Sequence, residues 1–282
     1  MCNRLWAFIP ALAYALHKQK KLDVFFAKQA YLDCFPHLKQ CNNVRFRCSH
    51  NRPTPASLEW RLAIWSEKKH LEIKEDLRNT TKIGFLSFID GWQHRDDISY
   101  IAEQKQRIVE LFKPEDSVIQ KVNGYFKDYD GLTIGVHVRR GDYKEYLGGK
   151  YYYSNEVYGQ ILDHLRSIFT EEGKRVRFLI CSNEPFNVNT PQKDLFSIDD
   201  TDAITDLYAL SRCDYIVGPP SSYSQWASFY GDVPLYQMFS AQTNFTKEAF
   251  SPIIRMDTFA NGKRILMDEN TQAFYLKQTE GK

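Results

Sequence analysis

The chain has 282 residues, of which 43% are hydrophobic and 26% are charged, as is typical of globular domains. This composition excludes a mostly disordered or collagen-like chain, and the length indicates one large domain or two smaller ones. Lysine and arginine total 37 against 35 aspartate and glutamate, so the net charge is only +2. A general nucleic-acid binder is usually far more basic, so any phosphate chemistry here rests on a few well-placed cations.

The cysteines do not form a CxxC pair, which argues against a zinc knuckle or a thioredoxin-like motif. Cys34, Cys41 and Cys48 recur every seven residues, which leaves two interpretations. They are either ligands of a metal cluster or unpaired thiols in a reducing cytosol, and the second is favoured. We expect no metal in the functional site.

The longest apolar run, residues 5–16, contains Pro10 and is too short for the roughly 20 residues that span a bilayer. Its lysines follow the apolar stretch, whereas a signal peptide carries its positive charge in front. We therefore expect a soluble cytoplasmic protein, at most peripheral to a membrane, with no integral membrane segment.

The first half of the chain mixes helical and strand patterns. We expect a helix over 5–20, a buried strand over 22–26, a loop over 49–60 and a strand over 82–89. Helices follow at about 97–112 and 115–126. Because no strand precedes the first helix, we expect the first strand of an open sheet to be missing from this sequence.

The second half alternates strands with helices. The expected strands cover 132–138, 177–181 and 214–217; the expected helices cover 154–172 and 203–212, and a further helix begins at Ser222. This alternation predicts an α/β fold with a parallel, doubly wound sheet. We place a lobe boundary near residue 125, which gives lobes of 1–125 and 126–282, with a last helix packing back on the first lobe.

Polar groups follow all three strands of the second half, at 139–142, 182–184 and 221–224. Ligands of doubly wound sheets bind at the carboxyl ends of the strands. Ser182, Asn183 and Glu184 therefore join the arginine and serine groups as candidate binding residues.

The sequence Gly135-Val-His-Val-Arg-Arg-Gly-Asp-Tyr143 is the strongest local signal. Strand alternation places His137 and Arg139 on one face and Arg140 on the other. Guanidinium groups beside a glycine suit a diphosphate, because arginine presents a planar fork of donors. Asp142 can hold one arginine in place. The alternative is a surface turn in which two arginines share an aspartate.

Two further segments suit the same ligand. Ser221 and Ser222 stand between a strand and a helix, where helix N–H groups and hydroxyls form an anion site, although simple N-capping is the alternative. Asn3 and Arg4 stand just before the first helix and can reach a ligand from the other lobe. The alternative for them is a chain end that contacts no ligand.

Together these segments resemble the α1,2-fucosyltransferases of glycosyltransferase family 11. GVHVRRGDY is similar to the family's HxRRxDY motif, and residues 206–226 resemble its C-terminal block with a Ser-Ser-aromatic turn. Residues 178–183 resemble its middle strand, and Asn3-Arg-Leu-Trp6 resembles the end of its N-terminal segment. The chain departs from the pattern in lacking the Gly-x-Gly before Asn3, and in having Pro-Pro before the Ser-Ser turn.

The resemblance implies a GT-B-like architecture of two Rossmann-like lobes that hold GDP-fucose between them. It implies an inverting, metal-independent transfer of fucose to a glycan hydroxyl, in a galactoside through an α1,2 linkage. By analogy Arg139 contacts the β-phosphate and Arg140 belongs to the same motif. His137 and Asp206 lie near the guanosine, and Ser221, Ser222 and Tyr223 line the phosphate turn.

The general base and the acceptor site are less defined. Asp142, Glu145 and Glu184 are candidates for the base, and Asp142 is equally suited to orienting an arginine. Acceptor loops are expected within residues 45–95, where Trp60, Trp65, Trp92 and His94 offer stacking faces but suit core packing better. Two other functions stay open: another nucleotide-sugar transferase of this architecture, and a catalytically silent glycan-binding relative.

Overall fold

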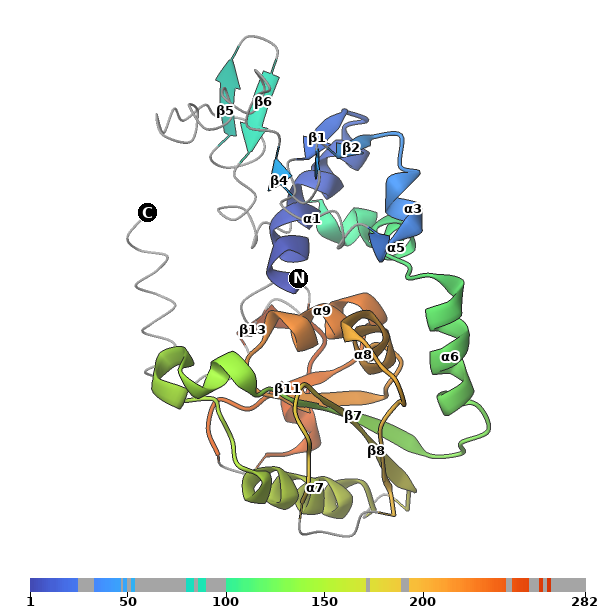
Figure 1. The fold of residues 1–282 in the computed structure, drawn as a ribbon, viewed down its shortest axis with the longest axis vertical. Helices are drawn as coiled ribbons and strands as arrows, with labels where there is room; N and C mark the ends of the chain where they lie inside the picture. Colours follow the sequence, from blue (N-terminus) through green and yellow to red (C-terminus); the bar gives the residue numbers. More distant parts are fainter. Residues whose placement is uncertain are drawn as a thin grey trace. The chain divides into compact units, whose positions relative to one another are not determined.

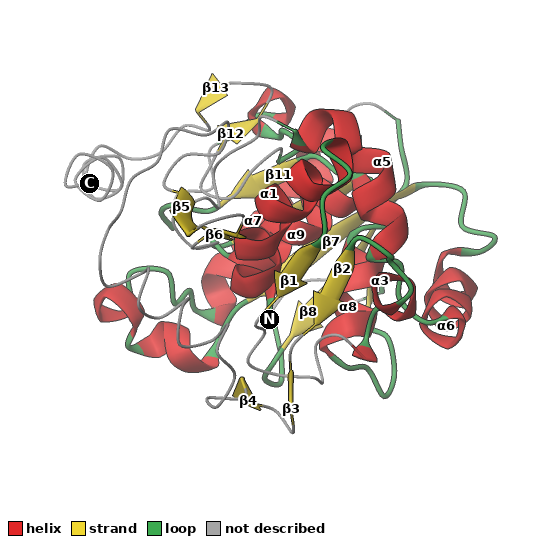
Figure 2. Cartoon of the chain, turned by 90° about the horizontal axis from the view of Figure 1, so that it is seen from above, coloured by secondary structure: helices red, strands yellow, loops and turns green. Residues whose placement is uncertain are grey.

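The structure of the chain is a computed structural model, and it contains both helices and strands (Figures 1 and 2). The described residues are 1–24, 33–46, 48–49, 52–53, 80–83, 86–89, 100–170, 173–188, 193–241, 245–253, 259–260 and 263–264. The chain divides into two compact units, one comprising Met1–Val118 and the other beginning at Ile119. Each unit is considered by itself.

The first unit is built around the buried helix α1 (Cys2–His17), which contains Pro10. It packs with α5 (Ile101–Leu111), and the short α3 (Pro36–Lys39) lies against α5. Phe112 joins the elements, since its ring meets Phe8 at 6.1 Å and Phe35 at 5.2 Å in edge-to-face contacts. Each such buried ring stabilises the unit by roughly 1.5–3 kcal/mol through its apolar area.

The strands of the first unit are short. β1 (Leu22–Val24) pairs in parallel with β2 (Val44–Phe46), as an α/β layer requires. β3 (Cys48–Ser49) pairs with β4 (Arg52–Pro53), and β5 (Thr80–Ile83) pairs antiparallel with β6 (Leu86–Ile89). Where the sequence predicted a single strand over 82–89, the structure has two antiparallel strands, β5 and β6. Trp60, Trp65, Trp92, His94 and the expected last helix lie outside the described residues.

The second unit contains a five-stranded sheet in which every described pair is parallel. Its strands are β7 (Leu132–Val138), β8 (Val176–Ser182), β9 (Leu195–Phe196), β10 (Tyr215–Gly218) and β11 (Leu235–Gln237), in the order β11-β10-β7-β8-β9. The three strands predicted from the sequence form its centre. β9 and β11 extend it on either side, and they are too short to show in the sequence pattern.

Helices cover both faces of this sheet (Figure 1). α7 (Asn155–Thr170) lies on one face, and α8 (Ala203–Leu210) and α9 (Ser222–Gly231) lie on the other. α6 (Asp116–Phe126) leads into β7, and the turns η1 (Gly141–Lys144) and η2 (Tyr146–Gly149) follow that strand. Later in the chain come η3 (Lys247–Ala249) and a pair of short strands, β12 (Phe259–Ala260) and β13 (Lys263–Arg264). The α/β class with a doubly wound parallel sheet is thereby confirmed.

The strand order changes direction between β7 and β10. From β7 the chain runs through α7 to β8 and β9, and it then returns through α8 to β10 on the other side of β7. A crevice forms at the carboxyl ends of two such strands because the connections leave in opposite directions. Any ligand of this sheet is therefore expected beside Val138 and Gly218, the last residues of these two strands.

Metal, disulfide and membrane features do not occur among the described residues. Cys41, Cys181 and Cys213, which are described there, are free thiols. Within the same ranges no group of three histidine, cysteine, aspartate or glutamate side chains could hold a metal ion. Nor does this part of the chain contain a helix with the length and apolar character needed to cross a bilayer.

Candidate functional site: the end of β7 and the serine turn

β7 places His137 at the sheet's switch point. Gly218, on the neighbouring strand, stands beside it so closely that a Cβ there would lie 2.8 Å from the His137 carbonyl oxygen. The absence of a side chain at Gly218 thus lets the ends of β7 and β10 approach each other. Both strand ends contribute to one surface for this reason.

His137 is a buried, neutral imidazole. Its side chain is 5% exposed, and burial together with the nearby Arg139 charge lowers the pKa of His137 to about 3. Its ring lies against that of Tyr223, with ring centres 5.1 Å apart. The buried Nδ1 has no hydrogen-bond partner among the described residues. The ring is therefore uncharged at neutral pH and has hydrogen-bonding capacity left for a ligand.

Arg139 lies next to His137 and is held in place from two sides. Its Nη2 donates to Asp142 Oδ1 at 2.7 Å, and its guanidinium lies 5.2 Å from the centre of the Tyr143 ring. The side chain is 33% exposed, and its buried Nε finds no partner in the described parts of the chain. Arg139 is a fixed cation with donors left for an anion.

The serine turn meets the same segment. Ser221 is the N-cap of α9, and its hydroxyl accepts a hydrogen bond from the backbone N–H of Tyr223 at 3.3 Å. Ser222 begins the helix and is half-buried. Tyr143, which stacks under Arg139, donates from its hydroxyl to the Pro220 carbonyl oxygen at 2.5 Å. The N–H-rich start of α9 and the Arg139 cation therefore belong to one structural cluster, which suits an anionic ligand.

The residues at the end of β8 brace the arginine turn. Asn183 Oδ1 accepts from the backbone N–H of Arg140 at 3.0 Å, and Glu184 Oε1 accepts from that of Gly141 at 3.1 Å. Ser182 donates its hydroxyl to the Glu184 carbonyl at 2.7 Å. Gly141 adopts a φ of +59°, a left-handed conformation that glycine takes without strain. This bracing fixes the direction in which Arg139 leaves the strand.

Arg140 points into separate surroundings. Its Nη2 donates to Asn155 Oδ1 at 2.5 Å, and its guanidinium lies 4.9 Å from the Tyr152 ring centre and 5.7 Å from that of Tyr158. Tyr158 also reaches the end of β7, because its hydroxyl donates to the His137 carbonyl oxygen at 3.4 Å, whereas no described hydrogen bond or ring contact joins Tyr152 or Asn155 to Arg139 or the serine turn. That both arginines hold one diphosphate stays a prediction; in the described contacts, Arg139 is the arginine that Tyr143 connects to the serine turn.

Asp206 lies in the first turn of α8, close to the same strand ends. It accepts from Thr201 Oγ1 at 2.6 Å, and burial raises the pKa of its carboxyl group. Its backbone carbonyl faces the Cys181 thiol at 3.9 Å, and Cys181 is the register partner of His137. Asp206 and His137 were both expected near the guanosine. Cys181 of β8 lies between them, since it contacts Asp206 and is paired with His137 across the sheet.

Asn3 and Arg4 belong to the other unit. Both residues were expected just in front of the first helix. The helix begins at Cys2, so they lie in its first turn instead. The helix begins earlier than expected because its buried face already includes Cys2, which shares that face with Leu5 and Trp6. Their role toward a ligand stays a prediction.

Several residues of this region had no role assigned from the sequence. Tyr143 was part of the quoted motif, but its link to Pro220 depends on two segments meeting in space. Tyr152 and Asn155, which surround Arg140, precede and begin α7 and carry no local motif. Gly218 could have been noticed as a glycine that ends a strand directly before a serine turn.

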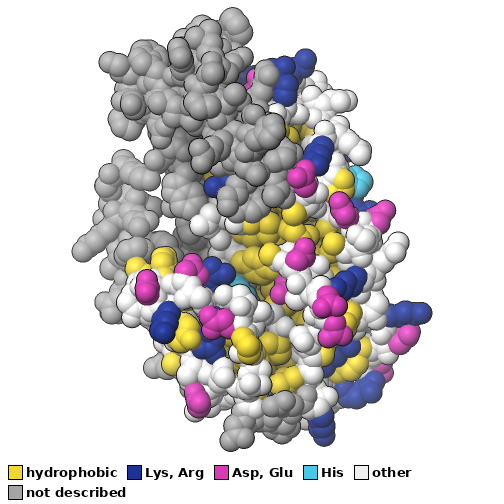
Figure 3. All heavy atoms as spheres, viewed as in Figure 1, with side chains coloured by type: hydrophobic (Ala, Val, Ile, Leu, Met, Phe, Trp, Pro, Cys, Tyr) yellow, Lys and Arg dark blue, Asp and Glu magenta, His cyan; other side chains and the backbone are white. Residues whose placement is uncertain are grey.

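The described surface is mixed in charge. On the face shown in Figure 3, lysine and arginine side chains are interspersed with aspartate and glutamate, without an extended patch of one sign among the coloured residues. An anionic ligand would therefore be recognised through local groups such as Arg139 rather than through a basic surface.

No protein-family model matches the chain, and it has no significant match among curated proteins. Among solved structures it is similar to the NodZ alpha-1,6-fucosyltransferase soaked with GDP-fucose, at 17% identity and a TM-score of 0.48, over 84% of this chain and 91% of that one. The fucosyltransferase NodZ from Bradyrhizobium gives 16% and 0.47, over 84% and 92%. A mutant of Arabidopsis thaliana FUT1 in complex with GDP gives 14% and 0.37, over 64% and 49%. These values are too low to assign a function, which has to be argued from the residues of this chain.

Proposed function

We propose that this chain is an inverting glycosyltransferase that moves fucose from GDP-fucose to a glycan hydroxyl, in a galactoside through an α1,2 linkage. The observation that carries the proposal is the cluster of Arg139, neutral His137 and the Ser221-capped start of α9 at the switch point of a parallel sheet. The choice of GDP-fucose rests on the resemblance of the GVHVRRGDY motif to the fucosyltransferases.

The geometry suits a diphosphate leaving group. As the bond between C1 of the sugar and the β-phosphate oxygen breaks, negative charge grows on that oxygen. Arg139 and the N–H groups of α9 stabilise this added charge, which is larger in the transition state than in the bound donor, and the barrier is thereby lowered. His137 donates a hydrogen bond as a neutral ring. In this proposal Asp206 belongs to the nucleoside side of the site, and Tyr223 lines the phosphate turn with Ser221 and Ser222.

The acceptor oxygen forms the new bond to C1 and releases its proton to a base. Two of the three candidate carboxylates already accept hydrogen bonds within the motif: Asp142 accepts from Arg139, and Glu184 accepts from the Gly141 N–H. Glu145 is exposed and has no side-chain hydrogen bond or ion pair among the described residues. We therefore assign Glu145 as the base and Asp142 as a positioning residue for Arg139.

Ligand binding tests the proposal directly. Thermal shift with GDP, GDP-fucose, GDP-mannose and UDP-galactose should show stabilisation by the three guanine nucleotides only, with transfer from GDP-fucose. Stabilisation by UDP-galactose instead would indicate a different nucleotide-sugar transferase. No shift with any nucleotide would favour a silent glycan-binding relative.

Arg139→Ala tests whether the nucleotide binds at Arg139. Loss of a charge-assisted contact worth ~1.5–3 kcal/mol should raise the Kd for GDP roughly 10- to 100-fold while the protein stays folded. Arg212→Ala is the matched control, because Arg212 is exposed after α8 in the same unit. Normal GDP affinity in Arg139→Ala would refute the assignment.

A further inference from the structure

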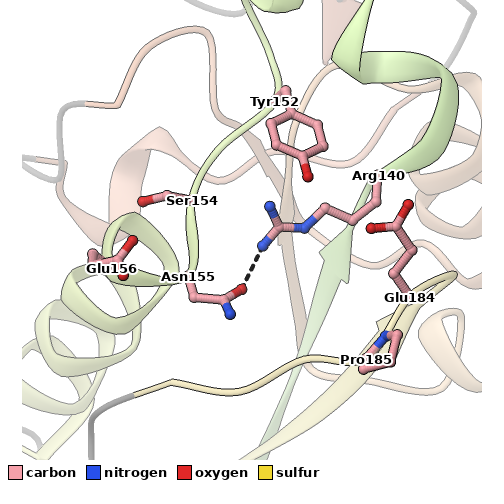
Figure 4. A pocket seen from close by; sticks show the side chains of 7 residues that line it. All are labelled: Arg140, Tyr152, Ser154, Asn155, Glu156, Glu184 and Pro185. Carbon is pink, nitrogen blue, oxygen red and sulfur yellow. Dashed lines mark hydrogen bonds between the residues drawn. The ribbon is translucent and has the colours of Figure 1, made fainter.

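A pocket of about 400 Å³ lies around the Arg140 side chain (Figure 4). Three segments form it: the turn after β7 gives Arg140, the approach to α7 gives Tyr152 and residues 154–156, and the end of β8 gives Glu184 and Pro185. Its volume falls within the ~300–1,000 Å³ range of small-molecule sites. The candidate nucleotide cluster of Arg139, His137 and Ser221 does not line it.

Arg140 is the centre of the pocket. It is only 6% exposed, its guanidinium lies between aromatic rings, and Figure 4 shows it reaching across to Asn155. A single hydrogen bond from Nη2 engages it, and within the described ranges it forms no salt bridge with a carboxylate. No Arg140 nitrogen is among the buried side-chain atoms that lack a partner, so its remaining N–H groups face the pocket, where a ligand can accept hydrogen bonds from them.

Acceptor groups of the pocket face the same space. The Glu184 and Glu156 side chains stand on opposite sides of Arg140 in Figure 4. One Glu184 oxygen binds the Gly141 N–H, which leaves the second for a ligand. A hydrogen bond from Ser154 lowers the pKa of Glu156, which keeps that carboxyl group ionised. One guanidinium against two carboxyl groups makes the pocket a poor site for an anion.

We propose that the Arg140 pocket binds an uncharged sugar unit of the acceptor glycan, an inference that rests on the proposed glycosyltransferase function. Sugar hydroxyls both donate and accept, so they match a pocket in which Arg140 and Asn155 offer N–H groups and Glu184 offers oxygens. The Tyr152 hydroxyl also points into the space and has no hydrogen bond in the described parts of the chain.

The pocket is placed to act together with the donor site. Arg139 and Arg140 are adjacent and leave the strand end on opposite sides, so the turn braced by Asn183 and Glu184 separates the two sites. A glycan held at Arg140 is thereby anchored beside the place where the donor phosphate is held. The pocket would select the acceptor without taking part in the chemistry.

Binding of the full chain to an array of immobilised oligosaccharides tests this, with neutral probes ending in galactose, glucose, mannose or N-acetylglucosamine and acidic probes carrying sialic acid or sulfate. Ser154→Trp fills the pocket from the α7 side and Pro185→Trp from the β8 side; both residues are exposed at its rim. Thr170→Trp is the control, because Thr170 is exposed at the far end of α7 and does not line the pocket. The Kd for GDP is measured on every variant.

We expect the wild type to bind at least one class of neutral probe, with saturating GDP present. Ser154→Trp and Pro185→Trp should both lose this binding at least tenfold while Thr170→Trp retains it, and all three should bind GDP like the wild type, which also shows that they are folded. Absence of binding to every neutral probe, binding to acidic probes only, or unchanged binding by Ser154→Trp or Pro185→Trp with normal GDP affinity would overturn the inference. Failure of the wild type to bind GDP would refute the proposed function instead.

Discussion

The Tyr143 hydroxyl donates a hydrogen bond to the Pro220 carbonyl oxygen at 2.5 Å, between residues 77 positions apart in the chain. Tyr143 is 8% exposed, and burial raises the pKa of its phenol to about 12, so it stays a donor over the physiological range. Its ring also supports Arg139. One side chain therefore sets the spacing between the cation and the serine turn.

Tyr143→Phe should weaken the connection between Arg139 and the serine turn. The variant leaves the Pro220 carbonyl without its partner, which costs about 1–2 kcal/mol of stability, and it should raise the Kd for GDP several-fold because the turn moves relative to Arg139. Tyr153→Phe is the matched control: Tyr153 is also buried and donates to the Met238 carbonyl at 2.7 Å. Urea unfolding and calorimetric GDP titration measure both effects. Equal GDP affinities in the two variants would show that Tyr143 only stabilises the fold.

Gly218→Ala should separate the two strand ends. The new Cβ would stand 2.8 Å from the His137 carbonyl oxygen and 2.9 Å from its Cβ, and backbone atoms cannot move aside as a side-chain tip can. We expect a loss of roughly 1–3 kcal/mol in the free energy of unfolding. Gly124→Ala in α6 has nothing within 4 Å and should stabilise by ~0.5–1 kcal/mol. A Gly218→Ala variant as stable as the wild type would mean that the strands do not approach this closely.

His137 should make the stability depend on acid. Its pKa is lowered from 6.5 to about 3 in the folded protein, so the unfolded state binds the extra proton between these values. Stability is therefore lost as the pH falls below 6.5, by about 1.4 kcal/mol per pH unit from this group. Between pH 7 and 5 His137 contributes a loss of roughly 2 kcal/mol, which His137→Gln should remove. Parallel pH curves of unfolding free energy for wild type and variant would contradict a buried neutral ring.

The sheet of the second unit was largely predictable because its strands carry strong local signals. Leu132–Val138 is a β-branched run, and the structure gives β7 the same bounds. Asp202 caps α8 by accepting from the N–H groups of Ile204 and Thr205, and an aspartate directly before an apolar helix is a recognisable N-cap signal. β9 and β11 were missed because two or three residues are too few to show a period, and they form only by pairing with strands already present.

The candidate site was predictable only where neighbours in sequence are also neighbours in space. Alternation along β7 correctly separated His137 and Arg139 from Arg140. The link from Tyr143 to Pro220 and the bracing of Gly141 by Glu184 join distant segments, and no local pattern encodes them. The destination of Arg140 also depended on Asn155, fifteen residues away.

The roles of Asp142 and Glu145 can be separated by kinetics with GDP-fucose. Asp142 holds Arg139 at 2.7 Å, so Asp142→Asn should chiefly raise the KM for the donor, with a modest loss in kcat. Glu145→Gln removes the proposed base and should lower kcat by roughly 10²- to 10⁴-fold, without a change in donor KM and with loss of the acidic limb of the pH–rate profile. The reverse pattern, a large kcat loss in Asp142→Asn beside a nearly normal Glu145→Gln, would identify Asp142 as the base.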